Sequence, residues 1–412
     1  MATLIGGGLA ERADGDFPPV ARGVLAFAFL MVAEFFYAWS WYSVDILRPF
    51  IRDSLHLSLT QAGSGYSAQA AGALVGAVVV GQMADRLGRR AMLMTVMVGY
   101  GLTLIGGVFV VSYGQFLAQR AVLGLFMGGI FPVVVGIYMG LFRTNVGGRL
   151  ASLINGTASF AIVVQGLAIG AIAGHDWRVL LWLGGVPPVL LAALAFIVVP
   201  RSADTRATRM PGAALPLLEL FAPSVRRRTI LLALLMGLNF FGYQAFSGWL
   251  TTYLRDGRAL APAVVGQLVA VVSTANIAGG FVWGWLGDRF GRRFDALGFF
   301  GAAAAIALYL SAPTGFGVLA VLGATYGFMV SCSVIWGPWL TELYPPHLKS
   351  TAASIFNWGR IVSIFAPLIT GQLASGVGLS ATMALASVVF VMAGVIWLSL
   401  PETNSRALLP GG

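Results

Sequence analysis

The sequence predicts an all-α membrane protein with twelve transmembrane helices, arranged as two pseudo-symmetric six-helix bundles. The first observation is composition: 58% of the 412 residues are hydrophobic and 10% are charged, whereas a soluble domain carries roughly 25% charged residues. The second is that the hydrophobic residues gather in twelve runs, each long enough to cross a bilayer. The third is that one motif of ten residues occurs once in each half of the chain.

The repeated motif has the pattern G-x-x-x-D-R-x-G-R-R and occupies residues 81–90 and 284–293, which lie 203 positions apart. Each copy separates two apolar runs, so it predicts a tight, charged loop at a membrane surface. A second pair of similar segments, 151–155 and 353–357, lies 202 positions apart. Matching segments at half-length spacing indicate a duplicated membrane protein.

The twelve helices follow from the apolar runs, because a transmembrane helix needs about 20 mostly apolar residues. Runs that meet this need lie near residues 23–47, 63–83, 92–111, 115–141, 151–173, 179–199, 229–254, 264–286, 295–311, 316–341, 351–374 and 378–400. The long polar connection at 200–228 reads as a cytoplasmic linker between a first bundle at 22–199 and a second at 229–401. We expect flexible cytoplasmic tails at 1–21 and 402–412.

Basic residues fall unevenly on the two sides of the predicted helices. Of the 25 Lys and Arg, 18 lie in loops on one side, 5 in loops on the other and 2 within apolar runs. The positive-inside rule makes the richer side cytoplasmic, so we expect a multi-pass protein of the inner (plasma) membrane with both termini in the cytoplasm. The same distribution accounts for the net charge of +10 and excludes a nucleic-acid partner.

Metal and cofactor chemistry finds no support in the sequence. The single cysteine, Cys332, lies in an apolar run, and His56, His175 and His347 all fall in loops. No disulfide within the chain is available, and we expect no metal and no cofactor.

Four charged residues lie within the apolar runs: Glu34, Asp45, Arg120 and Arg360. A charge at membrane depth costs at least about 2.5–3.5 kcal/mol, so each is a candidate functional residue. The helical rise places Glu34 and Arg120 at similar depths, which predicts a pair. A carboxylate that meets and leaves an arginine can bind and release a proton; the alternative is a static ion pair that holds the bundle together.

Asp45 and Arg360 carry separate expectations. At about 100° per residue, Glu34, Trp41, Asp45 and Arg48 share one face of their helix, and Asp45 is either part of the proton path or an interfacial residue paired with a nearby arginine. Arg360 lies about 15 Å into its helix, and we expect it to anchor the carboxylate of an anionic substrate. The alternatives are pairing with helix-end carbonyls or with Glu34.

Sparse polar groups among aromatic side chains describe a pocket for a small molecule. In the second half, the candidates around Arg360 are Asn239, Tyr243, Gln244, Ser333, Trp336 and Asn357. Each aromatic residue taken alone is as well explained by packing.

The two charged motifs resemble the signature loops of the major facilitator superfamily, which lie between helices 2 and 3 and between helices 8 and 9. Segments 241–243, 249–254, 342–351 and 357–361, together with Pro401-Glu402-Thr403, are similar to the aromatic-acid and sialic-acid proton symporters within it. The resemblance implies transport by alternating access, a cavity lined by helices 1 and 4, and an arginine at the position of Arg360 that is associated with an organic anion. Tyr42 stands where the aromatic-acid carriers have the first of two aspartates, which favours Glu34 as the coupling acid.

The motif charges have an expected role as a cytoplasmic gate. When the cavity faces outward, they can hold the cytoplasmic ends of the two bundles together; the alternative is that positive charge only sets the topology. The residues concerned are Asp85, Arg86, Arg89, Asp288, Arg289, Arg292 and Glu342.

Together these observations predict a secondary active transporter that takes up a small organic anion with protons, such as an aromatic, sugar or other carboxylic acid. One alternative is a proton-coupled exporter of drugs or organic cations, with Glu34 binding the cation. Another is a sensor built on the same fold. No nucleophile–base pair or phosphate loop indicates an enzyme, and we expect a monomer in the bilayer.

Overall fold

The computed structural model describes residues 18–138, 141, 147–172, 176–200, 218–345, 348, 352 and 355–403, apart from the side chains of some residues within the helices. The tail at 1–17, most of the linker at 200–228 and the tail from 404 onward lie outside these residues. Within them the secondary structure is helical. The α-helices are α1 (Val20–Ile46), α2 (Arg48–Ser54), α3 (Leu59–Leu87), α4 (Arg89–Gly106), α5 (Tyr113–Met127), α6 (Ile130–Tyr138), α7 (Gly147–Ile172), α8 (Val179–Ala192), α9 (Ala195–Val198), α10 (Arg226–Phe246), α11 (Leu250–Thr252), α12 (Pro262–Phe290), α13 (Ala296–Ser311), α14 (Phe316–Val330), α15 (Trp336–Glu342), α17 (Ile355–Val377) and α18 (Leu379–Ser399).

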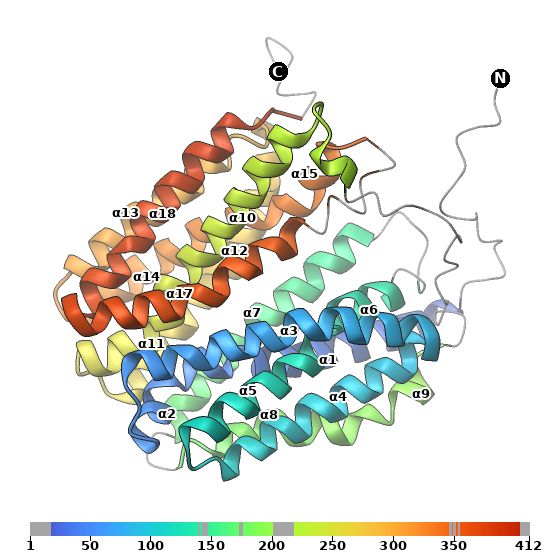
Figure 1. Cartoon of the computed structure of the whole chain (residues 1–412), viewed down its shortest axis with the longest axis horizontal. Coiled ribbons are helices and arrows are strands. Elements are labelled where there is room, and N and C mark those ends of the chain that lie inside the picture. The colour runs from blue at the N-terminus through green and yellow to red at the C-terminus, as the bar shows by residue number, and fades with distance from the viewer. Residues whose placement is uncertain are drawn as a thin grey trace.

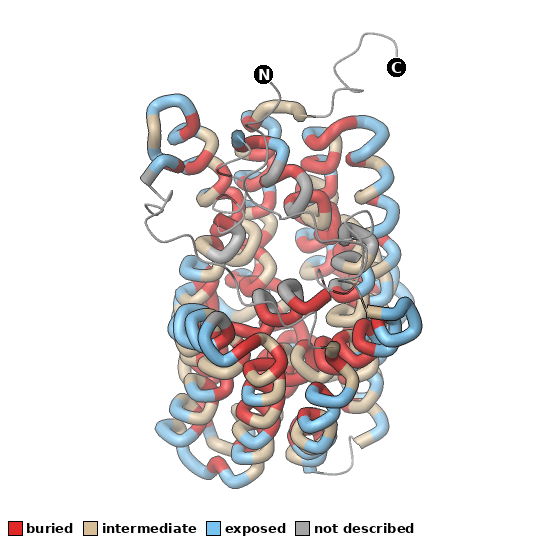
Figure 2. The backbone as a smooth tube through the Cα atoms, turned by 90° about the vertical axis from the view of Figure 1, so that its right-hand side faces the viewer, coloured by how far each residue is buried: buried red, intermediate tan, exposed pale blue. Residues whose placement is uncertain are grey.

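The helices form two groups that follow one another along the chain (Figure 1). Helices α1–α9 pack around one cluster of buried hydrophobic side chains, and helices α10–α18 pack around a second. Exposed residues lie on the outward faces of both groups (Figure 2), and many of them are large and apolar. Such a surface suits lipid rather than water, so the fold is that of a membrane protein built from two helical bundles.

Eight helices in the described part of the chain are long and apolar enough to cross a membrane, and three apolar helices are shorter. Some of the predicted spans are interrupted. The run at 115–141 becomes α5 and α6, with Gly128 and Gly129 between them. The run at 179–199 becomes α8 and α9, and α8 contains Pro187 and Pro188, which remove backbone donors from the helix.

The motif glycines explain how two long helices join through a single residue. Gly88 lies between α3 and α4 with φ 94°, and Gly291 follows α12 with φ 102°. These backbone angles are open to glycine at little cost and to other residues only with strain. The repeated motif therefore carries a structural turn as well as charges.

The bundles touch most closely toward the end of the molecule that carries α2 and α11, called here the α2 end. A Cβ atom added at Gly266 would lie 2.1 Å from the carbonyl oxygen of Gly166, and one added at Gly63 would lie 2.6 Å from the carbonyl oxygen of Pro367. Gly170 packs against Ala263 in the same seam. The opposite end, where α1 begins and α18 ends, is called the terminal end; there the two groups of helices diverge in Figure 1.

Candidate functional site

The centre of the site is a contact between α1 of the first bundle and α17 of the second. The guanidinium carbon of Arg360 lies 5.4 Å from the centre of the Trp41 ring, and the Tyr37 hydroxyl lies near the same guanidinium. Tyr37 and Trp41 stack, with ring centres 6.1 Å apart. Because Glu34, Tyr37 and Trp41 are spaced by three and four residues, they lie on one face of α1.

Two further side chains complete this arrangement from α3 and α17. The Tyr66 ring meets Trp41 edge-on with centres 6.3 Å apart, and its hydroxyl lies 3.4 Å from the Ser363 hydroxyl. The name central cluster is used below for Glu34, Tyr37, Trp41, Tyr66, Arg360 and Ser363. It joins a guanidinium, a carboxyl group, three aromatic rings and three hydroxyl groups from two bundles.

Glu34 is buried, with 6% of its surface exposed. Among the described residues, no hydrogen bond or ion pair within 4.0 Å reaches its carboxyl group, and Arg360 is the charge that acts on it. An acid in this position is held near a positive charge without being neutralised by direct contact. The alternative considered for Arg360, an ion pair with Glu34, is not formed within 4.0 Å in the described part of the chain.

The predicted pair between Glu34 and Arg120 is not formed. Arg120 donates hydrogen bonds to the Ser43 hydroxyl at 2.9 Å and to the Gln69 side chain at 3.4 Å. Ser43 lies nine residues beyond Glu34, which is roughly 13 Å further along α1 and about 180° around it. Helical side chains point back toward the N-terminus of their own helix, so the Arg120 guanidinium reaches toward the α2 end and away from Glu34.

Asp45 belongs to a second network, which joins the bundles near the α2 end. Its carboxylate accepts a hydrogen bond from Gln244 on α10 at 2.8 Å and forms an ion pair with Arg48. Arg48 also donates to the carbonyl oxygen of Gly248, and its guanidinium carbon lies 4.3 Å from the centre of the Trp249 ring. The Thr251 hydroxyl donates to the backbone carbonyl of Asp45 at 2.7 Å.

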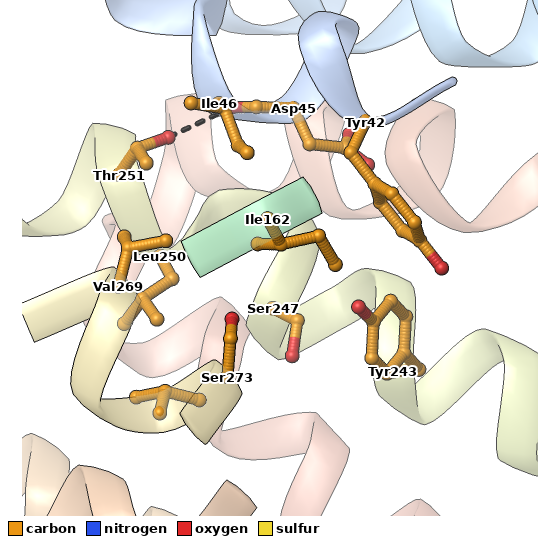
Figure 3. A pocket seen from close by; sticks show the side chains of 11 residues that line it. Tyr42, Asp45, Ile46, Ile162, Tyr243, Ser247, Leu250, Thr251, Val269 and Ser273 are labelled. Carbon is orange, nitrogen blue, oxygen red and sulfur yellow. Dashed lines mark hydrogen bonds between the residues drawn. The ribbon is translucent and has the colours of Figure 1, made fainter. Parts of the chain in front are cut away.

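A small cavity of about 50 Å³ lies beside this network. Tyr42 and Asp45 reach it from α1, and Tyr243 and Ser247 reach it from the other bundle (Figure 3). This volume holds one or a few water molecules. Of the predicted pocket residues, Tyr243 thus lines a water-sized cavity, and Gln244 binds Asp45.

The remaining predicted pocket residues are placed differently. Trp336 is buried in the core of the second bundle, against Phe299 and Trp397 with ring centres 5.6 and 5.2 Å away, so its place is that of a packing residue. The Ser333 hydroxyl donates to the carbonyl of Val330 at 3.3 Å. Asn239 is half-buried on α10, and the side chain of Asn357 lies outside the described residues.

Charged residues of the second motif form a chain of contacts at the terminal end. Arg292 binds Asp288 at 2.7 Å and Glu342 at 2.8 Å. The Glu402 carboxylate accepts hydrogen bonds from the backbone N–H groups of Arg292 and Arg293, each at 2.9 Å. These contacts tie α12, α15 and the segment after α18 together within one bundle.

The other predicted gate residues whose side chains are described are exposed or half-buried. The Arg289 guanidinium carbon lies 5.3 Å from the centre of the Trp285 ring on the same helix. Arg86 is exposed and Arg89 is half-buried. The side chain of Asp85 lies outside the described residues.

Asp295, which the sequence does not single out, is fully buried just before α13. Neither carboxyl oxygen has a hydrogen-bond partner in the described part of the chain, and a Cβ atom on Gly287 would lie 2.5 Å from one of them. Burial raises the pKa of this carboxyl group to about 8; Arg292 lowers the pKa, while Asp288 and Glu402 raise it. The folded protein therefore favours the protonated acid at this position.

Sequence reasoning missed three members of the central cluster: Tyr37, Tyr66 and Ser363. Tyr37 could have been found, since it follows Glu34 by three residues and so shares its face. The places of Tyr66 and Ser363 depend on how α3 and α17 are rotated against α1, which no periodicity in the sequence reports.

Within the described residues, no group of His, Cys, Asp or Glu could hold a metal ion.

This arrangement can bind a small anion between two bundles. A guanidinium offers paired donors that match a carboxylate, and aromatic faces offer flat apolar surface. An acid that shares the same guanidinium can hold a proton when a second anion arrives.

Comparison with known proteins agrees with this architecture. The sequence profile of the Major Facilitator Superfamily matches residues 30–358 and 257–412. A cis,cis-muconate transport protein from Acinetobacter baylyi is 28% identical over 363 residues, covering 84% of this chain and 86% of that protein. A 3-(3-hydroxy-phenyl)propionate transporter from Escherichia coli is 25% identical, covering 86% and 88%.

The fold is also found among solved structures. A bacterial homologue of the human lysosomal transporter Spinster, in an inward-facing and unoccupied conformation, superposes with a TM-score of 0.76 at 15% identity, covering 94% of this chain and 98% of that one. The two relatives named above are transporters rather than enzymes. The chain belongs to the Major Facilitator Superfamily and is a multi-pass membrane transporter of that fold.

Proposed function

We propose that this protein takes up a small organic anion together with a proton, and that the anion binds at the central cluster. The observation that carries the proposal is that Arg360 of one bundle lies against Trp41 on α1 of the other and acts electrostatically on the buried Glu34 carboxyl group of that helix. With no substrate bound, the two side chains balance in charge. A substrate carboxylate that binds Arg360 adds a second negative charge to the same buried space.

That second charge is the source of coupling. An uncompensated charge at membrane depth costs at least about 2.5–3.5 kcal/mol, so the loaded site is favoured when Glu34 carries a proton. One proton then accompanies one anion, and the net charge moved is zero. Because an anion that enters with one proton carries no net charge across the membrane, a potential that is negative inside does not oppose its entry.

The aromatic faces favour a flat substrate. The Arg360 guanidinium lies over the Trp41 ring, and the rings of Tyr37 and Tyr66 pack against Trp41. Aromatic rings stack well on planar groups. The two relatives described above carry the names of transporters for an unsaturated and an aromatic acid. Planar carboxylic acids therefore come first among candidate substrates, ahead of sugar acids and short monocarboxylates.

Alternating access is the proposed route. The glycine contacts and the Asp45 network join the bundles at the α2 end, and the helices diverge at the terminal end (Figure 1). The positive-inside rule places the terminal end in the cytoplasm, so the contacts at the α2 end close the extracellular side. We place the protein in the inner (plasma) membrane as a monomer with cytoplasmic termini, and a rocking motion of the bundles would expose the central cluster to the other side.

The test is uptake of radiolabelled organic acids into proteoliposomes, with and without an inward proton gradient. Wild type is compared with Arg360→Ala and Arg360→Lys. We expect gradient-driven uptake of one acid class, its loss in Arg360→Ala, and a KM raised by roughly tenfold or more in Arg360→Lys, because lysine keeps the charge but lacks the paired donors.

Arg22→Ala is the matched control, since Arg22 is an exposed arginine at the start of α1. Its uptake should equal that of wild type. Normal transport by Arg360→Ala would remove the anion site from Arg360. Transport of cations alone would replace this proposal with a proton-coupled exporter centred on Glu34.

A further inference from the structure

A repeated dipeptide outside the known motifs forms contacts between the bundles at the α2 end. Arg52-Asp53 and Arg255-Asp256 lie 203 positions apart, the same spacing as the charged motifs. Arg52 pairs with Asp256 at 3.0 Å, and Arg255 pairs with Asp53. Each dipeptide therefore gives its arginine to the other dipeptide's aspartate, in a reciprocal exchange between the two halves.

The four charges close into a ring. Within each dipeptide the arginine also lies 3.9 Å from its own neighbouring aspartate, so positive and negative groups alternate around the ring. The side chains are partly exposed, from 23% for Asp256 to 46% for Asp53. Solvent and salt can reach the ring, and so it can open without burying a bare charge.

A second reciprocal layer lies beneath the ring. Arg48 donates to the carbonyl oxygen of Gly248, and Thr251 donates to the carbonyl oxygen of Asp45. Arg48 and Thr251 are 203 positions apart, and so are Asp45 and Gly248. Both sets of contacts are therefore reciprocal between the two halves of the chain. In the first set, charged side chains pair with each other. In the second, a side chain of each half donates a hydrogen bond to a backbone carbonyl of the other half.

We propose that Arg52, Asp53, Arg255 and Asp256 are gating residues of transport: they form an outer latch that holds the extracellular side closed and must part when the site opens outward. The proposal rests on the alternating access proposed above. In this proposal the latch depends on opposite charges that face each other between the two halves. The order of arginine and aspartate in each dipeptide therefore decides whether the facing charges attract or repel.

Reversing that order provides the test. A one-arm swap, Arg52→Asp with Asp53→Arg, keeps composition and net charge but faces like charges across both pairs. A two-arm swap adds Arg255→Asp and Asp256→Arg and places opposite charges across both pairs again. The one-arm swap leaves the contact of Arg255 with the Phe50 ring in place, whose centre is 4.6 Å away.

The readout is labelling of a cysteine behind the latch by a membrane-impermeant maleimide added outside intact cells. Ser273→Cys serves as the reporter, because Ser273 is buried and lines the cavity between the bundles (Figure 3). The background variant is Cys332→Ala, which removes the single native cysteine.

We expect the one-arm swap to raise the labelling rate by about fivefold or more, as follows from losing two exposed ion pairs, and the two-arm swap to bring it back toward the wild-type rate. Thermal unfolding of each purified variant checks that it is folded. Unchanged labelling in the one-arm swap, or equally raised labelling in both swaps, would overturn the latch. Labelling is measured without substrate, so the result stands apart from whether any organic acid is transported.

Discussion

Replacing Glu34 with glutamine should separate the movement of substrate from the movement of protons. Glutamine has nearly the shape of a protonated glutamate and cannot ionise, so Glu34→Gln holds the site in the form that the bound anion requires. In wild type, a loaded site with ionised Glu34 leaves one negative charge uncompensated, at a cost of at least about 2.5–3.5 kcal/mol. That cost disfavours the unprotonated loaded site by roughly 70- to 400-fold.

The assay has two arms in the same proteoliposomes. In the first, an inward proton gradient drives uptake; at one proton per anion, each pH unit supports about tenfold accumulation in wild type, and Glu34→Gln should show none. In the second, external radiolabelled substrate exchanges with substrate already inside, a process that needs no net proton movement. Glu34→Gln should exchange at a rate close to wild type and with weaker dependence on pH.

Asp45→Asn is the comparison that distinguishes the two acids on α1. Asp45 is already paired with Arg48 and bound by Gln244, so its replacement should weaken the contact between bundles without uncoupling protons. If Glu34→Gln still accumulated substrate against its gradient, while Asp45→Asn exchanged without accumulating, the reasoning from the central cluster would be refuted and Asp45 would be the coupling acid.

Two further predictions concern the framework. Gly266→Val should force α7 and α12 apart, because a Cβ atom there lies 2.1 Å from the Gly166 carbonyl oxygen; we expect lost uptake, whereas Gly280→Val, on the same helix with nothing within 4 Å of its Cβ atom, should transport normally. Asp295→Asn should change how thermal stability depends on pH. Because burial raises the pKa of the Asp295 carboxyl group to about 8, the folded state keeps a proton that the unfolded chain releases near pH 4, and the stability from that proton is lost as pH rises through this range. The melting temperature of Asp295→Asn relative to wild type should therefore increase from about pH 4 to about pH 8, and a difference that stays flat would contradict the buried neutral acid.

The sequence predicts the fold well because its signals are those that a bilayer imposes. Apolar runs, loop charges and a repeat at half length each depend on local composition, and the helices lie where the runs indicate. Helix breaks such as the one at Gly128 and Gly129 are less visible, since two adjacent glycines in an apolar run can equally be continuous helix.

The site was harder to predict, because the depth of a residue in the membrane does not determine which way its side chain points. Glu34 and Arg120 have similar expected depths, yet the Arg120 guanidinium reaches back along its helix to Ser43, on the opposite face of α1. Trp336 shows a related limit: an aromatic residue in an apolar run suits a pocket or a core, and the packing of Phe299 and Trp397 decides for the core. Arg360 stands out in the sequence because an unmatched charge in an apolar run is conspicuous whatever surrounds it, and its role stays a prediction.

The internal repeat separates residues that frame the transporter from residues that bind. Contacts that close the α2 end recur at a spacing of 203, as do the turn glycines Gly88 and Gly291. The central charges do not recur: 203 positions after Glu34 lies Gly237, and 202 positions before Arg360, the spacing of segments 151–155 and 353–357, lies Ala158. A rocking motion between two similar bundles needs matched contacts on both sides of the axis, whereas one guanidinium shared by one acid and one substrate needs asymmetry. Charged residues that repeat across the halves are therefore expected at gates, and unrepeated ones at the site of coupling.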